Sequence, residues 1–296
     1  MNFNELIGNE KIKHNLIKTL NNKTVSHSYM FIGTKGVGKK IFAKEFAKGI
    51  LCINEENKLC SNCKSCLEFV NNNNPDYYEI GLQDDENSIK IETIRQMQKR
   101  IQELPIVSSR KVYIIDDSEY MTKDAQNCLL KTLEEPPEFV TIILIVSNEN
   151  KILNTIKSRC LKIYFNDLSE EELKKYISEN LEKDKFSENM LKACGGSIGK
   201  AKQICENKEL YDNLSVFNNI ENYSLLDVMP KLEFLYKSKD DIQDILEYLN
   251  TIFIEKAKQN IRCVDYIKYI EETKTNINAN CNYDMCIDKL IFKIFK

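Results

Sequence analysis

A glycine-rich loop between a strand-like and a helix-like segment is the feature that most constrains the fold of this chain. Residues 31–40 read FIGTKGVGKK, and the pattern G-x-x-x-x-G-K occupies residues 33–39. An apolar segment (28–33) precedes the loop and a helical pattern (39–50) follows it, the setting in which backbone N–H groups cradle phosphates. The sequence therefore predicts a P-loop. Its candidate nucleotide-binding residues are those of the loop itself, namely Gly33, Thr34, Lys35, Gly36, Val37, Gly38, Lys39 and Lys40.

The last position of this loop departs from the usual pattern. A Ser or Thr hydroxyl should follow Lys39 and bind magnesium, but the chain has Lys40 there. A lysine offers no ligand to the metal and adds a second cation, whereas phosphoryl transfer depends on the metal to neutralise developing charge. The residues alone leave open whether the chain hydrolyses a nucleotide, only holds one, or does neither, and they cast doubt on ATP and Mg²⁺ as its cofactors.

A second acidic motif accompanies the loop. The segment KVYIIDD (111–117) is an apolar strand that ends in Asp116 and Asp117. Asp116 occupies the position that assists the metal, and Asp117 stands where a glutamate, one methylene longer, would orient the attacking water. The alternative is a pair of strand-end acids that cap the following turn.

The order of the remaining segments predicts an α/β fold with a parallel sheet, because short apolar strands alternate with helical patterns as far as Phe165. After Phe165 the pattern becomes helical, and a capping box of Ser169 and Glu172 opens the first helix. We expect a P-loop domain over residues 1–165, a small helical domain over 166–207 and a C-terminal helical domain over 208–296. The expected strands are 28–33, 76–80, 111–117, 140–147 and 161–165.

Four cysteines form a cluster in LCINEENKLCSNCKSC. Cys52, Cys60, Cys63 and Cys66 follow the spacing C-x7-C-x2-C-x2-C, which fits a closed tetrahedral zinc site of four thiolates. Such a site is structural, because no coordination position remains for water or substrate. Unrelated free thiols are the alternative, and a thioredoxin-like redox pair does not explain the fourth cysteine.

Composition excludes several classes. A net charge of -3 argues against a strongly basic nucleic-acid binder. The N-terminus lacks the apolar core of a signal peptide, and the longest apolar run, VTIILIV (140–146), is too short to cross a bilayer. We therefore expect a cytoplasmic protein with no membrane partner.

In sequence the chain resembles the AAA+ clamp-loader family of bacterial DNA polymerase III, and within it the delta-prime type of subunit. The resemblance covers most of residues 1–207. It is carried by SHSYMFIGTKGVGKK, by the four cysteines that lead into NPDYYEI, by KVYIIDDSEYMTKDAQNCLLKTLEEPP, by SRC (158–160) and by GGSIGKA (195–201).

The resemblance implies a RecA-like AAA+ domain with a zinc module, a helical lid and a C-terminal collar for oligomerisation. It also implies a five-subunit ring with gamma/tau and delta subunits, which acts on the sliding clamp and on primed DNA through the complex. Arg159 of the SRC motif would then act in trans as the catalytic arginine finger of a neighbouring subunit, since a guanidinium offers several donors and a fixed charge to phosphate oxygens.

The resemblance implies that the gamma/tau subunits are the motors that hydrolyse ATP and that delta-prime is the stationary member of the ring. Three departures from the motifs of the motor subunits favour the delta-prime role for this chain. They are Lys40, Asp117, and Gly199 at the place where G-S-x-R-D-A carries a phosphate-sensing arginine. All three affect this chain's own pocket, whereas Arg159 is retained. The alternative is a catalytically active, gamma/tau-like AAA+ ATPase. A zinc-dependent nucleic-acid-binding module is the other class considered, but the segment around the cysteines offers few cations or aromatic side chains.

Overall fold

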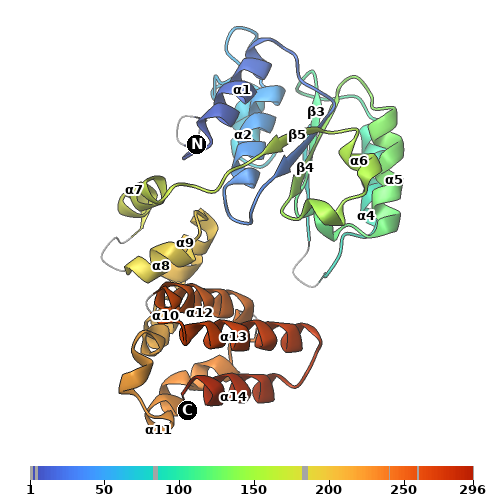
Figure 1. The fold of residues 1–296 in the computed structure, drawn as a ribbon. Coiled ribbons are helices and arrows are strands. Elements are labelled where there is room, and N and C mark those ends of the chain that lie inside the picture. Colours follow the sequence, from blue (N-terminus) through green and yellow to red (C-terminus); the bar gives the residue numbers. More distant parts are fainter. Residues whose placement is uncertain are drawn as a thin grey trace. The chain divides into compact units, whose positions relative to one another are not determined.

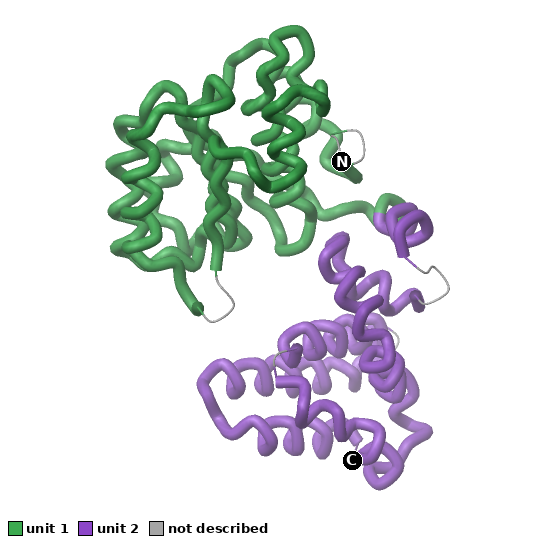
Figure 2. The backbone as a smooth tube through the Cα atoms, turned by 180° about the vertical axis from the view of Figure 1, so that it is seen from behind, with its two compact units in different colours: residues 1–172 green, residues 173–296 purple. Residues whose placement is uncertain are grey.

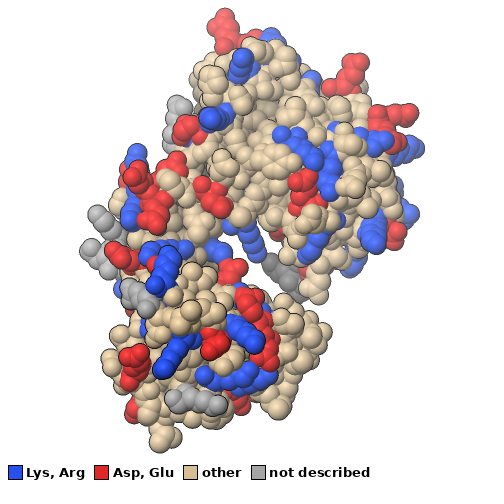
Figure 3. Space-filling model, viewed as in Figure 1, with Lys and Arg blue, Asp and Glu red and all other residues tan. Residues whose placement is uncertain are grey.

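A computed structural model describes residue 3 and residues 6–82, 86–181, 186–239, 241–258 and 260–295 of the chain. These residues divide into two compact units, 1–172 and 173–296 (Figure 2). Each unit has its own apolar core. On the face seen in Figure 3, basic and acidic side chains are interspersed, in keeping with the small net charge of -3.

A parallel sheet of five strands forms the centre of the first unit (Figure 1). Its strand order is β2-β3-β4-β1-β5. The parallel α/β architecture and the five strands expected from the sequence are thus confirmed, with each strand one or two residues shorter than expected. The strands are β1 (Ser28–Ile32), β2 (Tyr77–Ile80), β3 (Lys111–Ile115), β4 (Val140–Val146) and β5 (Leu161–Tyr164).

Helices cover both faces of this sheet (Figure 1). Alternation along each strand sends neighbouring side chains to opposite faces, so Val112 packs on the side of α1 and α2 while Tyr113 packs on the side of α4 and α5. This two-sided burial explains the continuous apolar runs of β3 and β4. The helices of the unit are α1 (Glu10–Asn21), α2 (Lys39–Leu51), α3 (Lys64–Val70), α4 (Ile91–Ile101), α5 (Lys123–Glu134), α6 (Asn154–Lys157) and, across the unit boundary, α7 (Glu170–Asn180), with the short 3-10 turns η2 (Ser118–Tyr120) and η3 (Glu149–Lys151).

The predicted capping box at the start of α7 is present. The backbone N–H of Ser169 donates to the Glu172 carboxylate at 2.9 Å, and the N–H of Glu172 donates to the Ser169 hydroxyl at 3.2 Å. Two donors that the first turn of a helix leaves without partners are satisfied in this way.

The second unit is helical throughout its described part, as the sequence predicts. One apolar core joins side chains from α7 to the C-terminal helix. The expected boundary near residue 207 falls inside this unit and stays a prediction. Among the described residues, no helix is long and apolar enough to span a bilayer. The elements are α8 (Glu188–Ala193), α9 (Ile198–Glu206), α10 (Lys208–Asn213), η5 (Leu214–Asn222), α11 (Leu225–Val228), η6 (Met229–Tyr236), α12 (Ile242–Ala257), α13 (Cys263–Asn278) and α14 (Tyr283–Ile294).

Candidate nucleotide and metal sites

The glycine-rich loop joins β1 to α2 at the carboxyl edge of the sheet, where β1 lies between β4 and β5. Gly36 and Gly38 adopt φ angles of 83° and 97°, a left-handed conformation that favours glycine. At Gly33 a Cβ atom would lie 2.9 Å from the carbonyl oxygen of Phe165, so only glycine fits against the end of β5. The backbone therefore has the turns that a P-loop requires.

Lys39, the residue expected to reach the β- and γ-phosphates, is directed back onto the loop. Its ammonium donates to the carbonyl oxygens of Gly33 and Thr34 at 2.6 and 2.7 Å, and to the Ser147 hydroxyl at 3.1 Å. Only 5% of Lys39 is exposed, and this burial lowers the pKa of the ammonium, against the opposing effect of nearby carboxylates, chiefly Glu119. The carbonyl groups of the loop thus serve as hydrogen-bond acceptors for its own lysine.

Lys40 forms the most informative contacts of the site. Its ammonium lies 2.6 Å from a carboxylate oxygen of Glu79 and 2.9 Å from a carboxylate oxygen of Asp116. Burial opposes the charge, but the hydrogen bonds with the two carboxylates outweigh it and raise the pKa of Lys40 to about 12. A permanent cation therefore sits on the carboxylate that the sequence assigned to magnesium.

Glu79 joins two lysines and was not expected from the sequence. One of its oxygens contacts Lys40, and the other lies 2.8 Å from the ammonium of Lys44. Burial raises the pKa of Glu79, but its hydrogen bonds with the two lysines prevail and lower it to about 2. The only signal available beforehand was an acid in a strand, YYEI, that ends at the same edge as β3.

Replacing Glu79 with glutamine tests whether its ion pairs with Lys40 and Lys44 stabilise the fold in a pH-dependent way. A carboxyl whose pKa falls from 4.5 to about 2 on folding stabilises the native state above pH 4.5, and this contribution disappears as the pH falls toward 2. We expect Glu79→Gln to lower the free energy of unfolding at pH 7 by about 1 to 2 kcal/mol, after allowance for solvent screening. Urea unfolding at pH 7 and pH 3 measures the change. An equal loss at both pH values would contradict the assignment.

Asp117 lies beside the same network. Its backbone has φ 48°, and its N–H donates to the carboxylate of Asp116 at 3.0 Å. Burial and then the charge of Asp116 raise the pKa of its carboxyl, and the neighbouring lysines only partly counter this. The backbone contact is of the kind that the turn-capping alternative describes.

Two further residues of the pocket were missed. Glu119 accepts a hydrogen bond from the backbone N–H of Ser147 at 3.1 Å, and the Ser147 hydroxyl in turn accepts from Lys39. Glu119 is 8% exposed, and its second carboxylate oxygen is buried without a partner among the described residues. Ser147 could have been found because it follows the buried strand next to β1. Glu119 lies in a short turn, and nothing in its sequence context indicated burial.

Arg159, the candidate finger, lies just beyond α6 and outside this pocket network. One guanidinium nitrogen is 2.7 Å from the Glu134 carboxylate, and another donates to the carbonyl of Thr155 at 2.8 Å. The side chain is 34% exposed. The guanidinium is thus accessible from solvent, although it is engaged within its own chain.

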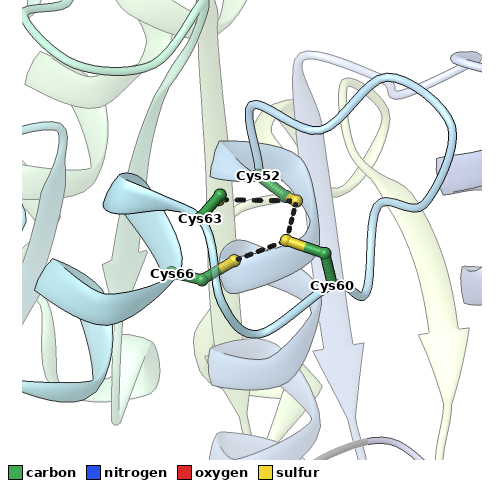
Figure 4. Close-up of side chains that lie close together, drawn as sticks. All are labelled: Cys52, Cys60, Cys63 and Cys66. Carbon is green, nitrogen blue, oxygen red and sulfur yellow. Dashed lines mark hydrogen bonds between the residues drawn. The ribbon is translucent and has the colours of Figure 1, made fainter.

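The four cysteines converge as their spacing predicts (Figure 4). Sγ of Cys52 lies 3.4 Å from that of Cys60 and 3.9 Å from that of Cys63, and the Cys60 and Cys66 sulfurs are 4.0 Å apart. Tetrahedral zinc with Zn–S bonds of about 2.3 Å requires sulfurs about 3.8 Å apart. All four sulfurs lie within 4.8 Å of one another, so the donor set and its size fit a zinc ion.

The surroundings of the cluster shift the pKa values of these thiols in different directions. Burial raises the pKa of Cys52 and of Cys66, while at Cys63 hydrogen bonds from backbone groups outweigh burial and lower the pKa to about 6. Four thiolates this close repel one another, so their joint ionisation needs a cation. Zinc would be held by Cys52 at the end of α2, by Cys60 in the loop and by Cys63 and Cys66 at the start of α3.

The strand order and the loop between β1 and α2 define the first unit as an α/β P-loop protein, consistent with the RecA-like fold expected from the sequence. The family described as "DNA polymerase III, delta subunit" matches residues 8–169, more than half of the chain. The chain therefore belongs to this family.

Related proteins carry gamma and tau names. The DNA polymerase III subunit tau/gamma of Haemophilus influenzae is 32% identical over 79% of this chain and 35% of its own length. The subunit gamma of Buchnera aphidicola subsp. Acyrthosiphon pisum is 32% identical over 84% of this chain and 71% of its own length. The chain spans only 31%, 35% and 38% of the length of the first three relatives that it matches.

A crystal structure shares the fold. It is that of a DNA polymerase III, gamma subunit-related protein from Thermotoga maritima, with a TM-score of 0.55 and 20% identity. The match covers 94% of this chain and 98% of that chain. At this identity the likeness supports the fold alone.

Proposed function

We propose that this chain is a subunit of the DNA polymerase III clamp loader in DNA replication. Its role would be that of the stationary delta-prime member, which has little ATPase activity of its own and donates Arg159 to a neighbouring motor subunit. Family membership and the gamma and tau relatives support the clamp-loader part of the proposal. The contacts within the pocket support the stationary role.

The observation that carries this proposal is the position of the Lys40 ammonium. It is bonded to Asp116 and Glu79, so the carboxylate that would assist Mg²⁺ already has a cation partner. A magnesium ion there would lie close to the positive charge of Lys40, and no hydroxyl is available at residue 40 to bind it. Hydrolysis in this pocket would lack its metal.

Two further elements belong to the proposal. The cysteine cluster would hold a structural zinc ion, because all its ligands are thiolates and none leaves an open position. The helical regions 166–207 and 208–296 would serve as lid and oligomerisation collar. Through them the chain would join gamma/tau and delta subunits in a five-subunit ring, meet the sliding clamp and primed DNA through that complex, and act in the cytoplasm.

A gamma/tau-like motor is the second candidate, and the names of the relatives favour it. It would require magnesium to bind through water and Asp116 despite Lys40. The absence of an arginine at Gly199, which lies in α9, counts against this candidate, since a motor would need that cation at its phosphates.

ATP hydrolysis by the purified chain tests the stationary role. With ATP and Mg²⁺ we expect turnover far below about 1 per second, the lower end of ordinary enzyme rates. A steady-state phosphate-release assay measures it. Turnover at motor rates that disappears with Lys39→Ala would refute the stationary role.

A gain-of-function variant tests whether Lys40 is what keeps Mg²⁺ from this pocket. Lys40→Thr removes the cation from Asp116 and supplies a hydroxyl, so we expect Mg²⁺ to tighten ATP binding to this variant by about tenfold or more. The matched control is Lys44→Thr, which also removes a lysine from Glu79 but leaves Lys40 on Asp116. Calorimetric titrations with and without Mg²⁺ provide the comparison.

A further inference from the structure

The ion pair between Arg159 and Glu134 links two elements that pack against each other. Glu134 is the last residue of α5, and Arg159 follows the C-terminal end of α6, on the same side of the sheet (Figure 1). The two charged groups are 2.7 Å apart. The other contacts of the guanidinium, with the Thr155 carbonyl and the Ser158 hydroxyl, come from its own segment. Within the described part of the chain, Glu134 is thus the anion paired with this guanidinium.

The backbone of Arg159 is held independently of its side chain. Its N–H donates to the carbonyl of Ile156 at 3.0 Å, and its carbonyl accepts from the Ser28 hydroxyl of β1 at 2.6 Å. In contrast, the side chains of Arg159 and Glu134 are 34% and 50% exposed. The backbone of Arg159 is therefore anchored to the sheet. Its guanidinium can move away from the Glu134 carboxylate without any change in the fold.

An exposed pair of this kind is a weak restraint. A phosphate carries more charge than a carboxylate and accepts the same two-pronged hydrogen bonds from arginine, so it competes effectively for the guanidinium. We propose that Glu134 is a positioning residue that keeps Arg159 withdrawn until a neighbour's nucleotide phosphate displaces it. This inference rests on the proposed function, because it assumes that Arg159 acts in trans.

The test uses the assembled loader with Glu134→Gln, which keeps the size of the side chain and removes its charge. The part of the ATPase rate that depends on Arg159 is obtained by subtracting the rate of the Arg159→Ala complex. Without the competing carboxylate, we expect kcat/KM for the Arg159-dependent ATPase to rise about two- to fivefold, equivalent to about 1 kcal/mol or less. The rise should come from a lower KM for ATP at unchanged kcat.

The controls separate restraint from a general structural effect. Glu135→Gln changes the adjacent exposed glutamate and is expected to leave kcat/KM unchanged. In the Arg159→Ala background, Glu134→Gln should have no effect, whereas a structural effect would persist there. An unchanged or lower kcat/KM with Glu134→Gln would overturn the inference. If Arg159→Ala itself leaves the loader unaffected, the proposed function fails instead.

Discussion

Replacing Arg159 with alanine is expected to reduce ATP turnover at the neighbouring site of the assembled loader by roughly 10³-fold or more. Arginine fingers contribute about 10³ to 10⁵ in rate where they stabilise the charge of a transferring phosphoryl group. The accessible guanidinium and its anchored backbone suit this role. Single-turnover hydrolysis and clamp loading with the reconstituted complex are the measurements.

The same variant should fold normally. The Arg159–Glu134 pair is exposed, and such pairs contribute about 0 to 1 kcal/mol to stability. Thermal unfolding of the isolated chain checks this. Arg95→Ala, an exposed arginine of α4, is the matched control and should leave the loader at full rate. A loader that works equally well without Arg159 would exclude the finger role.

Replacing Cys60 with serine is expected to lower the free energy of unfolding more than Glu79→Gln or Arg159→Ala does. Structural zinc contributes apparent energies of about 10 to 16 kcal/mol in small zinc-binding peptides, and a module attached to a folded sheet should lose only part of this. A loss of about 3 kcal/mol would lower the unfolding midpoint of the first unit by roughly 6 to 12 °C. Metal analysis and calorimetry measure both effects.

The contacts around the cluster indicate how far the damage should spread. Ser65 of α3 bonds to the hydroxyl of Ser108 at 2.9 Å, and that hydroxyl also donates to the carbonyl of Leu51 at 2.8 Å. Buried Asp76 accepts three backbone N–H groups from residues 106–108. We therefore expect the module to loosen while the sheet persists.

Cys281→Ser provides the control for the cysteine experiment, because Cys281 is exposed and distant in sequence from the cluster. It should retain zinc and the original midpoint, and a chelator should reproduce the effect of Cys60→Ser on the wild-type chain. Zinc content that is equal in both serine variants would contradict the assignment.

Much of the first unit was predictable because its signals are local. Continuous apolar runs predict strands buried on both faces, and glycine spacing predicts the loop. The convergence of the four cysteines also followed from spacing, since Cys52 to Cys66 span only a short segment. Ser169 and Glu172 indicated a helix start through a contact three residues apart.

The partners of the charged residues were not predictable in this way. Glu79 meets Lys40 because α2 packs on β3 and β2 lies beside β3, and that adjacency depends on the strand order of the whole sheet. Glu134 meets Arg159 because α5 packs against α6. A carboxylate in a strand or at a helix end looks like a solvated surface group until its neighbours are known.

The sequence by itself determined the α/β class, the P-loop and the residue types at its critical positions, because these depend on backbone conformation and local periodicity. The tertiary structure decided the partners of the charged side chains. Lys40 forms an ion pair with Asp116, and Lys39 donates hydrogen bonds to carbonyl groups of its own loop. Arg159 forms an ion pair with Glu134. The physical reason is that ion pairs act over a few ångströms, between residues that only the packing of strands and helices brings together.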